Sequence, residues 1–125
     1  MTASTLAQRA YGQSATPIRT PRGAEYDVFA RITHRLVAAG RNQKTAFPAL
    51  AKAIHDNRKL WTILAVDVAD GANKLPQDLR ARIFYLAEFT QAHSSKVLRD
   101  GASVTPLVEI NAAVMRGLRK GTPGT

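Results

Sequence analysis

The chain of 125 residues contains no cysteine and no long apolar run. Without cysteine it can form no disulfide framework, no thiolate metal site and no cysteine nucleophile. No stretch approaches the roughly 20 apolar residues of a membrane-spanning helix, and residues 1–11 lack the apolar run of a signal peptide. These absences predict a soluble, cytoplasmic protein that does not bind or span a membrane.

Strand signals are also scarce. Apolar and polar residues nowhere alternate over six positions. The Asp-Gly pairs at 70–71 and 100–101 follow expected helices instead of joining two apolar runs, so neither indicates a β-hairpin. We therefore predict an all-α fold.

Four segments carry the signals of helices. Apolar residues recur at three- and four-residue spacing in each, and a proline stands at or beside each expected start, where its missing N–H is not needed. We predict a compact antiparallel bundle of four principal helices. The predicted helices cover about residues 20–40, 47–70, 76–99 and 105–119.

The length suits one domain with a real core. We assign residues 20–119 to this helical domain. Residues 1–19 are predicted to be a flexible, basic segment in which residues 6–11 could form a short helix. Residues 120–125 have the composition of a disordered tail.

The stretch from Asn57 to Arg80 is the most informative part of the chain. It holds the only tryptophan, followed by a helix stop and a helix start. We expect Gly71 to end a helix in the left-handed conformation and Pro76 to occupy the first turn of the next helix. The weak helix formers at 55–57 could bend or break the helix that contains them.

Residues that could support catalysis or metal binding are few. The histidines are His34, His55 and His93, and none has the spacing of a zinc site. Asp67 and Asp70 lie three residues apart, but their simpler role is to cap the helix end or to pair with Lys74 or Arg80. We expect no catalytic residue, no metal and no cofactor, and therefore no enzyme.

Charge favours an acidic partner. Eighteen basic and nine acidic side chains give a net charge of +9, which would attract nucleic acid or an acidic protein. No block of five like charges marks a membrane-binding cluster. We interpret Arg80, Arg82 and Lys96 as pointing in different directions, so a dispersed basic surface is favoured over a specific nucleic-acid site.

The third predicted helix carries apolar residues on more than one side. These residues are Ile83, Phe84, Tyr85, Leu86 and Phe89. One bundle core cannot face all of them, so the surplus would meet a neighbouring helix, a homodimer partner or a client protein. The alternative is a central, well-buried helix.

Several segments together resemble the FlaF family of flagellar biosynthesis regulators. They are Pro21-Arg22 with Glu25 and Phe29, the stretch 57–80, Pro106-Leu107, Glu109-Ile110-Asn111, and Met115-Arg116-Gly117-Leu118. The resemblance covers roughly residues 20–119. It implies a flagellin-binding export chaperone and regulator that covers an amphipathic terminal segment of flagellin, with FlbT as a further partner. The alternative is an RNA-binding post-transcriptional regulator that acts through the basic surface.

A chaperone of this kind needs an apolar groove that accepts an amphipathic helix. The residues predicted to line the groove are Trp61, Leu64, Phe84, Tyr85, Phe89, Val114 and Met115. The residues predicted for its polar rim are Arg58, Lys59 and Arg80. Core packing is the competing interpretation of Trp61, and Met115 could also simply fill a gap in the core.

Overall fold

The computed structural model describes residues 21–120 of the chain, and side chains from residue 25 to residue 117. Within this range all the secondary structure is helical, which confirms the all-α prediction, and each predicted boundary lies within one residue of the observed one. The helices are α2 (Pro21–Gly40), α3 (Phe47–Ala69), α4 (Gln77–Asp100) and α5 (Thr105–Lys120). The predictions for residues 1–19 and 121–125 lie outside the described residues.

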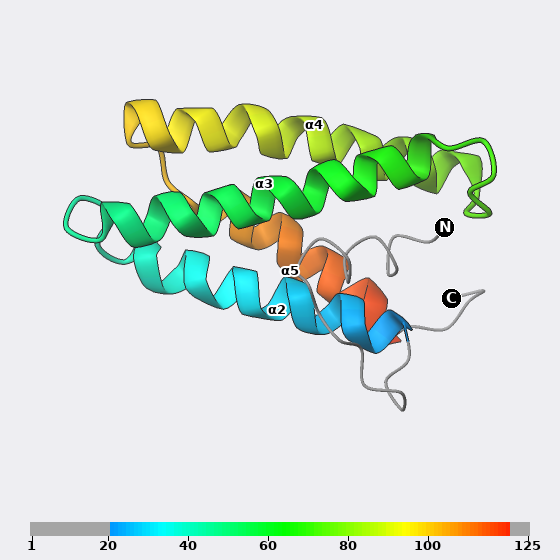
Figure 1. Cartoon of the computed structure of the whole chain (residues 1–125), viewed down its shortest axis with the longest axis horizontal. Helices are drawn as coiled ribbons and strands as arrows, with labels where there is room; N and C mark the ends of the chain where they lie inside the picture. Colours follow the sequence, from blue (N-terminus) through cyan, green and yellow to red (C-terminus); the bar gives the residue numbers. More distant parts are fainter. Residues whose placement is uncertain (1–20, 121–125) are drawn as a thin grey trace.

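The helices form a bundle in which each packs against its neighbours in the sequence. In Figure 1, α3 runs between α2 and α4. The shorter α5 packs mainly on α2, and its contact with α4 is the smallest between neighbouring helices. No helix in the described range is long and apolar enough to cross a membrane.

Buried apolar stripes of α2 and α3 make up most of the core. Phe29 and Trp61 are almost fully buried and meet edge to face, with ring centroids 5.9 Å apart. The stripes arise from the three- and four-residue spacing of their apolar residues. The large core side chains around this pair include Val28, Ile32, Leu36, Leu50, Ile54, Leu60 and Leu107.

A polar cluster lies inside this core. Asn111 of α5 is fully buried and accepts a hydrogen bond from Trp61 Nε1 at 2.9 Å. Its amide nitrogen donates to Thr33 Oγ1 at 3.1 Å and to Asn57 Oδ1 at 2.8 Å. One asparagine therefore ties α5 to both α2 and α3, although the backbones of α3 and α5 are not in contact.

The helix break considered at residues 55–57 is absent, because α3 is continuous through them. Asp56 and Asn57 are weak helix formers in isolation, but both are buried and have partners from other helices. These tertiary contacts outweigh the local preference of the two residues.

The prediction for Gly71 was wrong. Helix α3 ends at Ala69, followed by Asp70 in an extended conformation with φ −69° and ψ 130°. The Asp70 carboxylate accepts the Ala72 N–H at 2.9 Å, so a side chain makes this turn. Gly101 (φ 71°), after α4, is the only residue with positive φ in the described range. Pro76 directly precedes the first helical residue, Gln77, instead of occupying that position.

Gly40 lets the end of α2 approach the start of α5. A Cβ atom at this position would overlap Val104 Cγ2. We expect Gly40→Ala to lower the free energy of unfolding by about 2 kcal/mol, a typical cost of overpacking a core. Urea denaturation measures this as a lower midpoint at unchanged slope.

Gly117→Ala is the matched control, because a Cβ atom at this helical position would meet nothing within 4 Å. This variant should be as stable as the parent or more stable by up to about 1 kcal/mol, the helix preference of alanine over glycine. Equal gains from both substitutions would show that α2 and α5 do not touch at Gly40.

Candidate functional site

A shallow apolar hollow of about 230 Å³ lies between α3 and α4. This is smaller than the roughly 300 Å³ at which small-molecule pockets begin, so the hollow suits a side chain of a partner better than a cofactor. Trp61, almost fully buried in the core, contributes to its lining. The lining residues are Trp61, Thr62, Ala65, Val66, Ala69, Phe84, Ala87, Glu88 and Gln91.

The hollow lies where α4 is poorly covered. No residue of α4 before Ala87 is buried, and its other buried residues are Thr90, Ser94 and Val97. Large apolar side chains are accordingly exposed here: Phe84 is 40% exposed, and Val66 on α3 is 63% exposed. The alternative of a central, well-buried third helix is therefore wrong.

A polar network follows the same α3–α4 interface next to the hollow. The Arg58 guanidinium donates to the side chain and backbone oxygens of Gln91, at 3.0 and 2.9 Å, and to Ser95 Oγ at 2.7 Å. The Gln91 amide donates in return to the Arg58 carbonyl and to Thr62 Oγ1. Gln91 and Thr62 also line the hollow, so one side of it is polar and held by several hydrogen bonds.

The structure brings only some of the predicted groove residues together. Trp61 and Phe84 both line the hollow. Leu64 is 7% exposed and belongs to the core instead. Val114 and Met115 are half-buried on α5, packed against the core. The remaining two predicted residues, Tyr85 and Phe89, are exposed on α4 but do not line the hollow.

The three residues predicted for the polar rim do not lie together around the hollow. Arg58 reaches the hollow through Gln91, whereas Lys59 is exposed and is not in the lining. Arg80 donates instead to the carbonyls of Val68, at 3.1 Å, and Asn73, at 3.4 Å. A cation near the last carbonyls of α3 complements the helix dipole, so Arg80 holds the α3–α4 connection in place.

On the α3 side of the hollow, the sequence predicted Trp61 but missed the other four lining residues. Thr62, Ala65, Val66 and Ala69 recur at three- and four-residue spacing and provide that side. Their spacing is a signal in the sequence, but three of the four are small or polar, and the larger apolar stripe of α3 is the stronger pattern.

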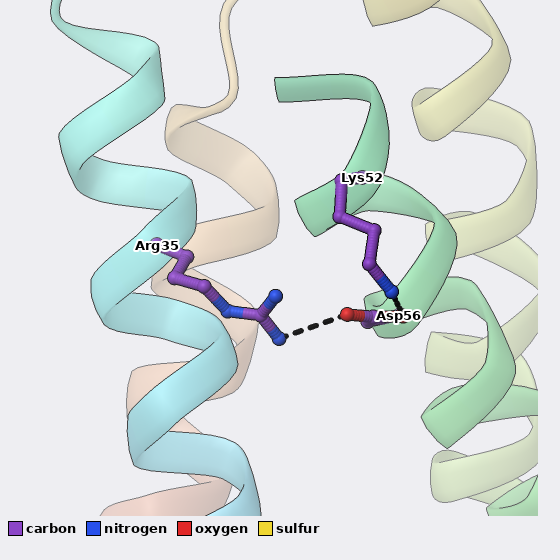
Figure 2. A network of polar contacts seen from close by, with 3 residues as sticks. All are labelled: Arg35, Lys52 and Asp56. Atoms are coloured by element: carbon purple, nitrogen blue, oxygen red, sulfur yellow. Dashed lines mark hydrogen bonds and ion pairs between the residues drawn. The ribbon is translucent and has the colours of Figure 1, made fainter. Parts of the chain in front are cut away.

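A charged cluster on α2 and α3 stabilises the opposite side of the bundle. Asp56 is nearly buried and binds Arg35 at 2.9 Å and Lys52 at 3.0 Å (Figure 2). Burial by itself would raise the pKa of Asp56, but the hydrogen bonds and positive charges of Lys52 and Arg35 outweigh it and lower the pKa below its ordinary value of 3.8. The ionised carboxylate therefore favours the folded state.

This shift predicts a pH dependence of stability. A carboxyl group whose pKa is lower in the folded protein contributes stability above its unfolded pKa and loses it as the pH falls through the folded pKa. We expect Asp56→Asn to lower the free energy of unfolding by about 1 kcal/mol at pH 7, since Arg35 and Lys52 are partly exposed to screening solvent.

Thermal unfolding from pH 7 down to pH 3 measures this difference. The stability of the parent protein should fall toward that of Asp56→Asn as the pH drops below about 5. Asp100→Asn, which removes an exposed carboxylate at the end of α4, is the control and should retain the parent's pH slope. A gap between parent and Asp56→Asn that stays constant with pH would contradict the ion-pair explanation.

The prediction that Arg82 and Lys96 point in different directions was wrong. Arg82 and Lys96 are 14 residues apart, about four helical turns, so they share a face and do not point in different directions. Both are exposed. Between them lie Tyr85, 65% exposed, and Phe89, whose ring stacks on His93 with centroids 5.7 Å apart. We call this set, exposed except for the half-buried His93, the α4 outer row: Arg82, Tyr85, Phe89, His93 and Lys96.

The histidines show no metal-site arrangement. No group of three or more histidine, aspartate or glutamate side chains in the described range could hold a metal ion. His93 contacts the Ser103 carbonyl through Nε2 at 2.7 Å, linking α4 to the segment before α5. Asp67 Oδ2 accepts a hydrogen bond from Asn73 Nδ2 at 3.3 Å, so it takes part in the α3–α4 connection.

Comparison with known families decides the affiliation of this four-helix chain. The family model described as flagellar protein FlaF matches residues 7–118. The chain belongs to the FlaF family. The match includes all of the hollow and the core, and it also extends upstream of α2. Comparisons with curated proteins and with solved structures gave no match.

Proposed function

We propose that this FlaF protein binds flagellin in the cytoplasm as a chaperone and regulator that supports flagellin synthesis and export. The observation that carries the proposal is the apolar hollow between α3 and α4, in a protein of a flagellar family. An amphipathic helix can place an apolar anchor in such a hollow and continue along the neighbouring surface with anchors at three- and four-residue spacing.

The amphipathic ends of flagellin explain why a binding site of this kind would be needed. The ends of flagellin are amphipathic segments that pack only in the assembled filament, so free chains expose apolar faces. Covering one end would prevent premature assembly and keep the chain ready for export. This role makes and breaks no covalent bond, so the proposal includes no catalytic residue, metal or cofactor.

Regulation follows from the same binding. Free chaperone accumulates when flagellin has been exported, and it could then report the state of export to the synthesis machinery through a partner such as FlbT. In this proposal the regulatory signal is the occupancy of the hollow, and no second site is required.

Co-purification with flagellin, followed by light scattering, tests the proposal. Full-length flagellin should form a complex of defined mass, and removal of one terminal segment of flagellin should abolish that complex while removal of the other leaves it intact. A complex that survives both truncations, or no complex with full-length flagellin, would contradict the proposal.

RNA binding is the second candidate, favoured by the α4 outer row. Exposed aromatic rings and basic side chains on one helical face are a combination that single-stranded nucleic acid uses for stacking and phosphate contacts. An unstructured RNA added to the co-purification distinguishes the candidates. Salt-sensitive retention of RNA, lost in Tyr85→Ala, without any flagellin complex would favour RNA. A flagellin complex that is indifferent to RNA would favour the chaperone.

A further inference from the structure

We propose that residues 6–11 of the chain dock into the α3–α4 hollow as an internal ligand and compete there with the external partner. The proposed competition with the partner rests on the proposed function, whereas the docking of residues 6–11 does not. The argument combines the chemistry of the hollow, the position from which the N-terminal segment leaves the bundle, and the sequence of that segment.

The segment has the pattern that the hollow accepts. Residues 6–11 read Leu-Ala-Gln-Arg-Ala-Tyr, and in a helix Leu6, Ala7, Ala10 and Tyr11 would form one apolar stripe. A helix this short is marginal in water by itself, so an apolar surface must stabilise it. The hollow offers such a surface, bounded by the exposed Val66 and Phe84 side chains.

Charge complementarity supports the same occupant. Residues 1–20 contain Arg9 and Arg19 and no acidic residue. The exposed Glu88 stands in the lining of the hollow. Arg9 borders the apolar stripe of residues 6–11, and it would lie beside the hollow when Leu6 or Tyr11 fills it. A contact between Arg9 and Glu88 would then fix the orientation of the segment.

The start of α2 lies at the level of the hollow. Helices α2 and α3 run antiparallel from the connection at 41–46 (Figure 1). At 1.5 Å per residue, Pro21 is about 29 Å from this connection along α2, and Ala65 is about 27 Å from it along α3. The segment therefore leaves the bundle at about the height of the hollow, one helix away from it.

Residues 12–20 are long enough to bridge that distance. Nine extended residues span up to about 30 Å, whereas neighbouring helix axes are about 8–10 Å apart and α3 is about 10–12 Å in diameter. A short tether also gives the segment a millimolar effective concentration. Even a weak intrinsic affinity would therefore occupy the hollow for much of the time.

A spin label tests the docking without any partner protein. The chain has no cysteine, so Gln8→Cys carries a nitroxide at one position, on the polar side of the proposed helix. We expect paramagnetic broadening of the backbone amides of Ala65, Val66, Phe84 and Glu88. The broadening should disappear when Leu6→Asp and Tyr11→Asp are added. Broadening confined to other helices, or none at all, would overturn the proposal.

A charge-reversal cycle tests the orientation. Arg9→Glu or Glu88→Lys alone should weaken the broadening at the hollow, and the two together should restore it. Additive losses with no restoration would overturn the proposed contact between these residues. Circular dichroism of every variant checks that the bundle remains folded.

Flagellin titration tests the competition. If residues 6–11 occupy the hollow nine-tenths of the time, their removal raises flagellin affinity about tenfold. Deletion of residues 1–12 should produce this increase, and unchanged or lower affinity would overturn the competition. A third outcome is that flagellin fails to bind both with and without the segment while broadening at the hollow is observed. This result would support the docking and contradict the proposed function.

Discussion

Phe84→Asp is expected to reduce flagellin affinity at least about 100-fold while leaving the helical content unchanged. Phe84 is 40% exposed in the lining of the hollow, so its replacement removes an aromatic contact from the partner and little from the core. A carboxylate here would also be desolvated by the bound helix without a partner. Losses of about 3 kcal/mol are typical when an anchoring contact of an interface is destroyed.

Tyr85→Asp is the matched control for this prediction. Tyr85 is the next residue on the same helix and is 65% exposed, but it does not line the hollow. Titration calorimetry with flagellin should show a change of less than about threefold, as expected for a residue outside the hot spot. Equal losses of flagellin affinity in both variants would indicate that flagellin binds the α4 outer row instead of the hollow. Lost helicity in Phe84→Asp would place this side chain in the core.

Asn111→Ala is expected to lower the free energy of unfolding by about 4 kcal/mol. The substitution removes the acceptor of the Trp61 indole and the donor to both Thr33 and Asn57. Each buried polar group left without its partner costs about 1–3 kcal/mol. The cavity left by the amide adds to this loss. Much of a typical domain stability of 5–15 kcal/mol would disappear.

Thermal and urea denaturation measure this loss. For a domain of this size, about 4 kcal/mol corresponds to a fall in Tm on the order of 15 °C. Glu109→Ala, at an exposed position of α5, is the control and should change stability by less than about 0.5 kcal/mol. A loss below about 1 kcal/mol in Asn111→Ala would show that the buried polar cluster does not hold α5 in place.

The helices were predictable because their signals are local. Apolar spacing and the proline at or beside each helix start are signals carried by nearby residues, and the observed boundaries lie within one residue of the prediction. The errors occurred where a tertiary or side-chain contact replaced the local preference. Asp70 makes the turn that Gly71 was expected to make, and Asn57 remains helical because Asn111 binds its side chain.

The site was less predictable because it lies between two helices. Trp61 and Leu64 belong to one apolar stripe of α3, yet only Trp61 also reaches the hollow beside α4. The periodicity of one helix shows which residues share a face but does not show which neighbour each edge of that face meets. Val66 lines the hollow because α4 lies beside this edge of α3.

The outer face of α4 shows a different kind of failure. Simple helical geometry already places Arg82 and Lys96 on one face, so this arrangement could have been recognised from the sequence. The sequence also predicted that Tyr85 and Phe89 lie outside the core, but not that they lie away from the hollow. The structure exposes them because α5 covers only a small part of α4.

Site-specific photo-crosslinking from the hollow tests the central claim most directly. The chain lacks cysteine, so Val66→Cys can carry a benzophenone at the hollow, and His34→Cys on the exposed side of α2 serves as the control position. We predict cross-links from position 66, mapped by mass spectrometry to a single terminal segment of flagellin, and none from position 34. Equal cross-linking from both positions, or none from position 66 in a flagellin complex, would contradict binding at the hollow.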